Sequence, residues 1–359
     1  MKRNWVGVVA VLLVACGGGG GSGSSSNFDQ VGTTLNGFVT SSAPAPSGQV
    51  SGYSFALTDS SGTLYETAGG NLNTSAFLAI ASATKLPSVI AILTLVDAGK
   101  LDLDTPVANY LNTLDPSFNW PVANQAITMR MLLSHTAGIR QSSESPSDCL
   151  NDLTTTLRLC AQNIANSPLD NPPGSTFSYT GADFQIAGYV ATLLAGSSWQ
   201  TFFANTVATP LGLTTFTYGP TQNPRIAGGA LSNVDDYIKI LRMILKDGVA
   251  DNGASVLSSE MIHQLKISQT GTATFSLPSS FPSNADSTGY TLGLFVTNAA
   301  DYTSAGSPGP EFTDPGLFGT TPWFDSGLGY AAIILIYQDT ATGIDMLNAV
   351  RPVVIDALH

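Results

Sequence analysis

The sequence predicts an α+β fold of the α/β-sandwich type, with one antiparallel sheet built from strands of both chain ends. Strand-like patterns occur at residues 51–57 and 63–67, and again at residues 290–297 and 328–338. The chain between these two groups of strands is dominated by helical periodicity. Its 359 residues and 43% hydrophobic content are ample for a large core. We therefore expect helices to flank the sheet and to form a mostly helical second region.

The remaining elements follow from apolar spacing and from turn signals. A Pro/Gly break at residues 43–48 precedes the first strand, and a turn at residues 59–62 separates the first two strands. Residues 102–125 and 271–287 are predicted to be loop, the former with short helical pieces. Helices are predicted over residues 28–39, 84–98, 127–134, 182–194, 234–248, 258–267 and 344–358.

A serine and a lysine stand three residues apart where the most apolar helix begins. Pro87 is tolerated only in a first helical turn, so this helix begins near Thr84 and leaves Ser82 at its N-terminus. Residues at this spacing share one helix face, so the Lys85 amine can reach the Ser82 hydroxyl. The positive helix end and dry surroundings favour an uncharged amine, which makes Lys85 a suitable base for Ser82.

A simpler interpretation of this pair is a serine that caps the helix and a lysine that extends into solvent. Ser-x-x-Lys occurs by chance in most chains of this length, so the motif alone does not settle the choice. The context of the motif on both sides favours a serine nucleophile activated by lysine.

The N-terminal residues have the pattern of an export signal. Lys2 and Arg3 precede a short apolar run, and small residues lead to Cys16. The run is too short to span a bilayer as a permanent helix. The sequence before Cys16 resembles the lipobox of bacterial lipoproteins, in which cleavage leaves a lipidated cysteine at the N-terminus. The alternative is an ordinary secretory signal followed by a chance cysteine.

We therefore divide the chain into three parts. Residues 1–15 are predicted to be a lipoprotein signal peptide, residues 16–27 a flexible Gly/Ser tether, and residues 28–359 the folded domain. The protein would be exported and anchored to a membrane through Cys16. Because Gly17 replaces the aspartate associated with inner-membrane retention, the periplasmic face of the outer membrane is expected in a Gram-negative host.

The net charge of the chain disfavours anionic partners. Without residues 1–15 the chain has 11 Lys and Arg against 25 Asp and Glu, a net charge of −14. Such an acidic surface disfavours binding to nucleic acid or to anionic lipid.

The two remaining cysteines, Cys149 and Cys160, are predicted to form a disulfide in an exposed loop of an exported protein. Two cysteines are too few for a structural zinc site, and no histidine lies near them, so no metal is expected.

Four segments together resemble the family of class C β-lactamases, penicillin-binding DD-peptidases and related family VIII-type esterases. They occur in the family's order and spacing and extend over roughly residues 28–358, which predicts a β-lactamase/transpeptidase-like fold. The segments are residues 80–85 with 99–107, residues 127–139, residues 172–179 with 210–213, and residues 290–293 with the glycine-rich stretch around Gly316.

The resemblance assigns a role to three residues. Ser82 matches the nucleophile that is acylated, and Lys85 matches its activating partner. Tyr179 matches the tyrosine of the Tyr-x-Asn motif, which relays protons to the leaving group and to the deacylating water. A phenol beside an ammonium group loses its proton more easily, so Tyr179 suits this task. The alternative for Tyr179 is an aromatic residue packed in the core at the end of a strand.

Two positions depart from the family pattern. Gly181 stands where the motif usually has asparagine, which removes an amide that would contact the substrate and Lys85. Asp314 stands where the third motif of the family has a lysine or histidine. A carboxylate there would repel the substrate carboxylate that the cation binds in lactam-recognising members.

The rest of the third motif is retained. Gly316 lets the backbone approach the substrate, and the N–H groups of Ser82 and Leu317 can form the oxyanion hole. A rival third motif at residues 269–271 has the sequence Gln-Thr-Gly but lies in a predicted loop after a helix.

The resemblance implies a serine hydrolase that forms an acyl-enzyme, and the substrate is expected to carry an ester or amide carbonyl. Carboxylesterase, DD-peptidase-like and β-lactamase activities all remain open, and uncharged or cationic acyl substrates are favoured over penicillins. The alternative is a catalytically weak or inactive penicillin-binding-like lipoprotein that binds cell-wall peptides.

A third reading, a Ser-His-Asp esterase of the α/β-hydrolase type, is disfavoured. The three histidines are His135, His263 and His359, and no Gly-x-Ser-x-Gly elbow is present. His135 is expected to bind backbone at a helix end. No phosphate-loop or Rossmann glycine pattern occurs, so no cofactor is predicted.

Overall fold

The computed structural model describes residues 28–140, 148–279, 281, 287–297 and 310–359. The predicted signal peptide, the lipidation site Cys16 and the predicted tether to residue 27 lie outside these residues. In the part of the chain that is described, no helix is both long enough and apolar enough to cross a membrane.

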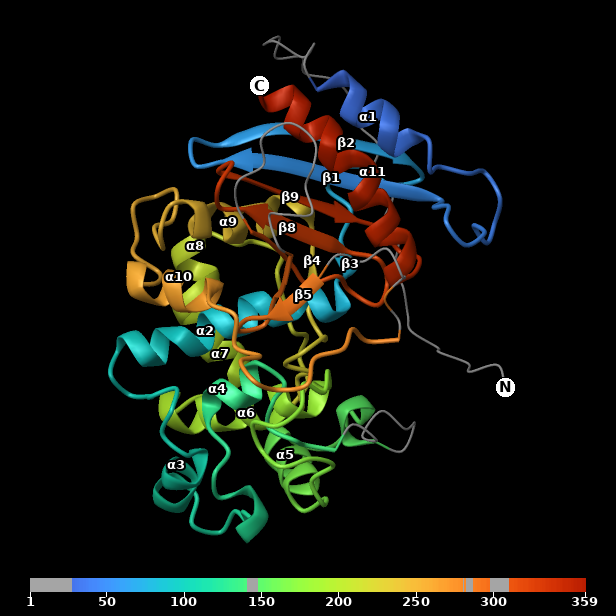
Figure 1. Ribbon diagram of the computed structural model, residues 1–359. Helices are drawn as coiled ribbons and strands as arrows, with labels where there is room; N and C mark the ends of the chain where they lie inside the picture. The colour runs from blue at the N-terminus through green and yellow to red at the C-terminus, as the bar shows by residue number, and fades with distance from the viewer. Residues whose placement is uncertain (1–27, 141–147, 280, 282–286, 298–309) are drawn as a thin grey trace.

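A seven-stranded sheet forms one layer of the molecule (Figure 1). Its strand order is β2-β1-β9-β8-β7-β6-β5, and each neighbouring pair is antiparallel. Because β1 pairs with β9, the sheet joins the two ends of the described chain, which confirms the predicted architecture. The strands are β1 (Gly52–Asp59), β2 (Thr63–Gly70), β5 (Ser287–Tyr290), β6 (Phe295–Thr297), β7 (Glu311–Thr313), β8 (Thr321–Asp325) and β9 (Tyr330–Leu335).

Helices cover both faces of this sheet. The helices α1 (Asp29–Asn36) and α11 (Thr340–Leu358) contact one another and pack on one face (Figure 1). Trp323 of β8 points into this layer, whereas its neighbour Phe324 joins the core on the other side. Such alternation follows from the two-residue period of a strand. The opposite face is covered by α9 (Val234–Leu245), which contacts β1 and β9.

The second region is mostly helical, as predicted. Its helices are α2 (Lys85–Asp97), α3 (Val107–Leu114), α4 (Met129–Leu133), α5 (Leu157–Ala165), α6 (Gly181–Ala195), α7 (Trp199–Phe203), α8 (Thr209–Leu211) and α10 (Ser259–Lys266). Short 3₁₀ or π stretches occur at η2 (Ala81–Thr84), η3 (Val122–Asn124), η5 (Cys149–Asn151) and η6 (Ala204–Ala208), and a small two-stranded sheet pairs β3 (Leu78–Ala79) with β4 (Leu231–Ser232).

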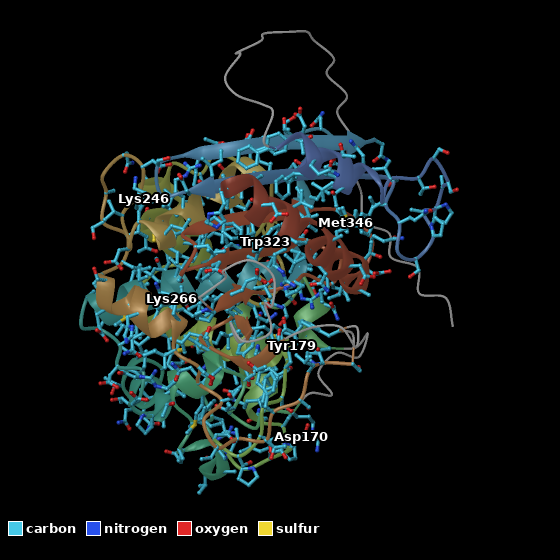
Figure 2. The ribbon with its side chains drawn as sticks, turned by 45° about the horizontal axis from the view of Figure 1, so that its top comes forward. Asp170, Tyr179, Lys246, Lys266, Trp323 and Met346 are labelled. Atoms are coloured by element: carbon cyan, nitrogen blue, oxygen red, sulfur yellow. A yellow bond between two sulfur atoms is a disulfide. The ribbon has the colours of Figure 1, made fainter. Side chains whose placement is uncertain are left out.

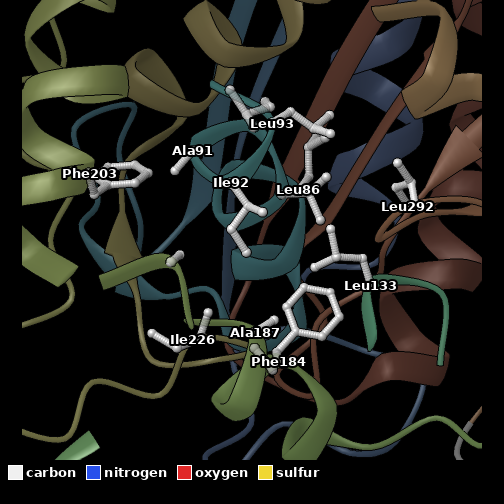
Figure 3. Close-up of a cluster of buried hydrophobic side chains, with 14 of the residues drawn as sticks. Leu86, Ala91, Ile92, Leu93, Leu133, Phe184, Ala187, Phe203, Ile226 and Leu292 are labelled. Atoms are coloured by element: carbon white, nitrogen blue, oxygen red, sulfur yellow. The ribbon is translucent and has the colours of Figure 1, made fainter. Parts of the chain in front are cut away.

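Helix α2 is the centre of this region. Its apolar residues are buried around nearly the whole circumference, as its sequence predicts. Leu86 and Ile92 lie in one cluster with Leu133 of α4 and with Phe184 and Ala187 of α6 (Figure 3). The packing fixes the first turn of α2, where Lys85 lies.

One predicted strand differs in the structure, and two strands were not predicted. Residues 291–294 form the turn of a hairpin between β5 and β6, because Gly293 adopts a φ of 83° and the Thr291 N–H donates to the Leu294 carbonyl. The prediction of one strand there is wrong. Strands β7 and β8 were missed because they are short and because Pro322, which cannot donate to a ladder, argues against a strand.

Candidate active site

Ser82 lies in the 3₁₀ turn η2, which leads directly into α2. Ala81, immediately before it, has a φ of 45°, a conformation that residues with a side chain seldom adopt. Such backbone strain persists only where the surroundings hold it, and it is concentrated at functional sites. Ser82 itself is half-buried, so its hydroxyl lies at the helix N-terminus without being enclosed.

Lys85 is the first residue of α2 and is only 2% exposed. Its Nζ donates hydrogen bonds to the Tyr179 hydroxyl at 2.7 Å and to the Ala227 carbonyl at 3.2 Å. The amine also lies 4.3 Å from the centre of the Tyr179 ring. The structure therefore brings the predicted base and the predicted tyrosine together.

Tyr179 ends the extended segment before α6, where Thr180 caps the helix. It lies between the sheet, marked by Trp323, and the lower helical region, marked by Asp170 (Figure 2). Its hydroxyl donates to Asp314 Oδ1 at 3.0 Å, while accepting from Lys85. The tyrosine oxygen thus lies between an amine and a carboxyl group.

Asp314 follows β7 directly and is fully buried. The sequence led us to expect a carboxylate presented to the substrate, and this expectation is wrong because Asp314 is buried and its Oδ1 accepts a hydrogen bond from Tyr179. Burial raises the pKa of Asp314 to about 7, although the nearby Lys85 and the hydrogen bond from Tyr179 act in the opposite direction. A carboxyl group with this pKa exchanges its proton near neutrality.

Gly316 packs on the backbone just before Ser82. A Cβ at this position would overlap the carbonyl oxygen of Ile80, so only glycine permits the close approach. Leu317 directly follows this contact in the chain, and the oxyanion hole expected from the N–H groups of Ser82 and Leu317 stays a prediction. Leu317 itself is 60% exposed.

The rival third motif lies elsewhere in the hydrogen-bond network. The Gln269 N–H donates to the Tyr290 carbonyl, and the Gln269 side chain accepts from Arg130. Asp314 instead contacts Tyr179 directly. The geometry therefore favours the segment from Asp314 to Leu317 as the third motif.

At Gly181 the structure shows what replaces the expected asparagine. Gly181 is the first residue of α6, and a Cβ there would lie 3.3 Å from the Leu150 side chain and 3.7 Å from Ala227. Leu150 belongs to η5, which a disulfide between Cys149 and Cys160 ties to α5. Cys160 is fully buried, so this disulfide is not the exposed staple that we expected. It supports the leucine that crowds the place of the missing amide.

A buried pair that the sequence did not identify lies behind Tyr179. His135 Nδ1 is 2.9 Å from Asp183 Oδ2, and the Thr180 N–H approaches the same ring nitrogen at 3.5 Å. The imidazole packs against the Tyr179 ring, with 4.7 Å between the ring centres. Burial, together with the charge of Lys85, lowers the pKa of His135, and burial raises the pKa of Asp183. Both residues therefore favour their neutral forms.

This pair could have been found from the sequence. Asp183 is the one charged residue in the otherwise apolar helix α6, and a charge in such a helix is rarely buried without a partner. The predicted contact of His135 with backbone is also present, as the longer hydrogen bond that the Thr180 N–H donates to its ring.

Aromatic side chains form a wall beside Tyr179. The ring of Phe295 lies 5.4 Å from that of Tyr179, and Phe281 continues the wall at 4.6 Å from Phe295. Phe177 and Tyr290 complete the cluster and are buried. Tyr179 is therefore surrounded by apolar rings on this side, and of the rings named here Phe281 is partly exposed.

Among the residues that the structure describes, no group of three His, Cys, Asp or Glu side chains is arranged to hold a metal ion.

The sequence matches the Beta-lactamase family over residues 28–351. It is 30% identical over 234 residues to penicillin-binding protein 4 of Amycolatopsis lactamdurans, an alignment that covers 55% of this chain and 58% of that protein. The aligned part thus spans less than two thirds of that relative's length.

Similar solved structures include a putative beta-lactamase from Bacteroides dorei DSM 17855. It has a TM-score of 0.77 at 23% identity and covers 91% of this chain and 99% of that one. EstCE1, a hydrolase with promiscuous acyltransferase activity, has a TM-score of 0.71 at 18% identity and covers 92% of this chain and 100% of its own. At these identities the similarity establishes a shared fold, that of the β-lactamases and transpeptidases.

Proposed function

The chain belongs to the beta-lactamase family of serine hydrolases, and we propose that it hydrolyses uncharged esters or amides through an acyl-enzyme on Ser82. One observation carries this proposal. A buried carboxyl group, Asp314, contacts the Tyr179 hydroxyl where the resembled enzymes have a cation that binds the substrate carboxylate. The site therefore lacks the charge that a penicillin carboxylate needs.

The proposed reaction uses Lys85 and Tyr179, which already contact one another, together with Ser82 in the turn that leads into α2. The Ser82 hydroxyl attacks the carbonyl carbon, and its proton passes to the pair formed by Lys85 and Tyr179. The N–H groups of Ser82 and Leu317 stabilise the oxyanion. Tyr179 then protonates the leaving group and later removes a proton from the water that hydrolyses the acyl-enzyme.

The surroundings support a neutral, apolar substrate. The aromatic cluster next to Tyr179 is apolar and has the partly exposed Phe281 at its edge, and the predicted mature chain has a net charge of −14, which disfavours anionic substrates. EstCE1, which shares the fold, is described as a hydrolase with acyltransferase activity. Esterase chemistry is therefore the first activity to measure.

The test is hydrolysis of p-nitrophenyl butyrate and of a chromogenic cephalosporin by the purified protein and by Ser82→Ala. We expect ester turnover that falls by at least ~10⁴-fold in the variant, as removal of a nucleophile does, and little cephalosporin turnover. Ester turnover that survives in Ser82→Ala would refute the nucleophile. Fast cephalosporin turnover would refute the substrate preference.

One observation favours a second candidate, a catalytically weak lipoprotein that binds cell-wall peptides. Leu150 crowds the space of the asparagine amide that is missing at Gly181, and this loss can slow turnover. A fluorophosphonate probe separates the candidates, because it labels an activated serine covalently. Absence of labelling in folded protein would favour the binding protein.

We also propose export and lipid anchoring at Cys16, which rest on the sequence alone. Metabolic labelling with a fatty-acid analogue should mark the full-length protein and not Cys16→Ser. Equal labelling of both would refute this attachment site.

A further inference from the structure

The Tyr179 hydroxyl has a defined direction in its hydrogen bonds. Lys85 Nζ donates to the tyrosine oxygen at 2.7 Å, so this oxygen is an acceptor toward the amine. The tyrosine hydrogen then points to Asp314 Oδ1 at 3.0 Å. The order of donation is therefore Lys85 to Tyr179 to Asp314.

We propose, as an extension of the function proposed above, that Asp314 is a positioning residue that accepts the Tyr179 proton while Ser82 is acylated. In the resembled family a cation at this position cannot accept a proton from tyrosine. This chain would therefore keep the arrangement of lysine, tyrosine and third-motif residue, but Asp314 would accept a proton where the family has a cation.

The surroundings of Asp314 suit a proton acceptor. The residue is fully buried, and its second oxygen, Oδ2, has no hydrogen-bond partner among the described residues. A carboxylate with so few donors is poorly stabilised, so it gains a proton more readily than a solvated one. The pKa of Asp314, raised to about 7 by burial, agrees with this geometry.

The other titratable groups near Asp314 do not compete for this role. Tyr237 of α9 and Tyr290 of β5 lie within the influence of its charge, and the pKa of each is raised, first by burial and then by the Asp314 charge. Both phenols therefore keep their protons. Lys85 supplies the compensating positive charge, and His135 lies behind the Tyr179 ring as a neutral imidazole.

The proton steps balance without a further reactant. As the Ser82 oxygen bonds to the carbonyl carbon, its O–H bond breaks and the proton moves to the Tyr179 oxygen. The original Tyr179 proton moves to Asp314 Oδ1, which becomes a carboxylic acid. When the leaving group departs, Tyr179 gives it a proton and recovers its own from Asp314.

The test measures the rate of Ser82 labelling by a fluorophosphonate and kcat for p-nitrophenyl butyrate between pH 5 and 9. In the wild type we expect both rates to rise with pH to a plateau, with a midpoint near 7, because only ionised Asp314 accepts a proton. The Asp314→Asn variant keeps the shape of the side chain, but its amide cannot accept the Tyr179 proton. We expect it to lower the plateau roughly 10²-fold, to abolish the midpoint near 7 and to leave KM for the neutral ester nearly unchanged.

Two comparisons keep this test specific. Asp102→Asn, which changes an exposed loop carboxylate, should retain the wild-type profile. In a Tyr179→Phe background the substitution Asp314→Asn should have no further effect, because Asp314 acts through the phenol. If Asp314→Asn fails to fold, loss of the midpoint in Tyr179→Phe alone still supports the proposal, and its persistence overturns it.

Failure of this inference differs from failure of the proposed function. If the wild type is labelled and active, and Asp314→Asn has the same rates and pH profile, the role of Asp314 is refuted while the nucleophile stands. If the wild type is neither labelled nor active, or if Ser82→Ala behaves identically to it, the proposed function is refuted, and this inference with it.

Discussion

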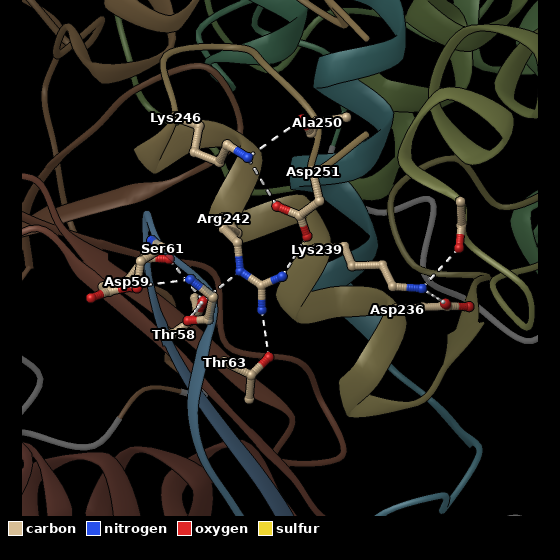
Figure 4. A network of polar contacts seen from close by, with 12 residues as sticks. Thr58, Asp59, Ser61, Thr63, Asp236, Lys239, Arg242, Lys246, Ala250 and Asp251 are labelled. Atoms are coloured by element: carbon tan, nitrogen blue, oxygen red, sulfur yellow. Dashed lines mark hydrogen bonds and ion pairs between the residues drawn. The ribbon is translucent and has the colours of Figure 1, made fainter. Parts of the chain in front are cut away.

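Two fully buried aspartates, Asp236 in α9 and Asp314 after β7, are held in opposite ways. The Asp236 carboxylate accepts hydrogen bonds from the backbone N–H groups of residues 214–216 and from the Thr215 hydroxyl. It also forms an ion pair with Lys239 (Figure 4). Asp314 accepts from the Tyr179 hydroxyl, and its Oδ2 has no hydrogen-bond partner among the described residues.

The pKa values follow this difference. Burial alone would raise the pKa of Asp236, but the donors around its carboxylate outweigh burial and lower it. At Asp314 burial prevails and the pKa rises to about 7. Burial of an acid therefore does not identify its role. The number of donors around it separates a carboxylate that fixes the structure from one that exchanges protons.

The largest loss of stability is expected from Asp236→Asn. The amide has one acceptor oxygen and places an N–H group against backbone donors, so we expect the free energy of unfolding to fall by about 3 kcal/mol. The loss should shrink as the pH falls through the lowered pKa of Asp236, because the wild-type carboxylate is then protonated as well. Denaturant unfolding with a constant m-value measures it.

The matched control is Asp251→Asn, at the exposed end of the neighbouring Arg242 network (Figure 4). Asp251 is 47% exposed, so its loss should cost less than about 1 kcal/mol. Equal losses at positions 236 and 251 would show that the donors around Asp236 contribute little.

Asp314→Asn is expected to change stability in the opposite direction. Because the folded-state pKa of Asp314 is above the unfolded value, the folded protein loses stability as the pH rises from about 4 to about 7. The charged form costs up to about 4 kcal/mol above pH 7, by the free energy of a three-unit pKa shift. Asparagine carries no charge, so the variant should unfold at a higher temperature than the wild type at pH 8.

The same thermal scans at pH 3 provide the control, because Asp314 is then largely protonated in both the folded and the unfolded state and the difference should nearly vanish. A variant that is less stable than the wild type at pH 8 would mean that the Asp314 carboxylate is well stabilised. In that case the contrast with Asp236 would be lost.

Local patterns were enough to predict much of this molecule. The apolar run after Ser82, together with Pro87, predicts where α2 begins, because the limits on proline depend only on the helix itself. The pairing of the terminal strands also follows from the order of the elements. The spacing of Ser82 and Lys85 predicts their common location at the start of α2, but not which partners Lys85 contacts.

Non-local packing determined what the sequence could not predict. Asp314 and Tyr179 are 135 positions apart, so neither their contact nor the complete burial of Asp314 is visible in the chain. The hairpin at Gly293 replaced a predicted strand because one glycine with a positive φ overrides an apolar pattern. Asp183 was overlooked, although its charge within an apolar helix was visible.

The smallest effect on stability is expected from Asp183→Asn. This variant tests whether a buried acid with few hydrogen-bond donors always exchanges protons. Its Oδ1 lacks a hydrogen-bond partner among the described residues, as Asp314 Oδ2 does, but its neighbour is His135. The pKa of Asp183 is raised by burial and that of His135 is lowered, so the pair is neutral. Asparagine then replaces a protonated carboxyl group, and Asp183→Asn should change the free energy of unfolding by less than about 1 kcal/mol. A loss of about 3 to 5 kcal/mol would instead reveal a buried ion pair. In that case the number of hydrogen-bond donors would not be enough to assign a role to a buried acid, and the charge of its neighbour would have to be considered as well.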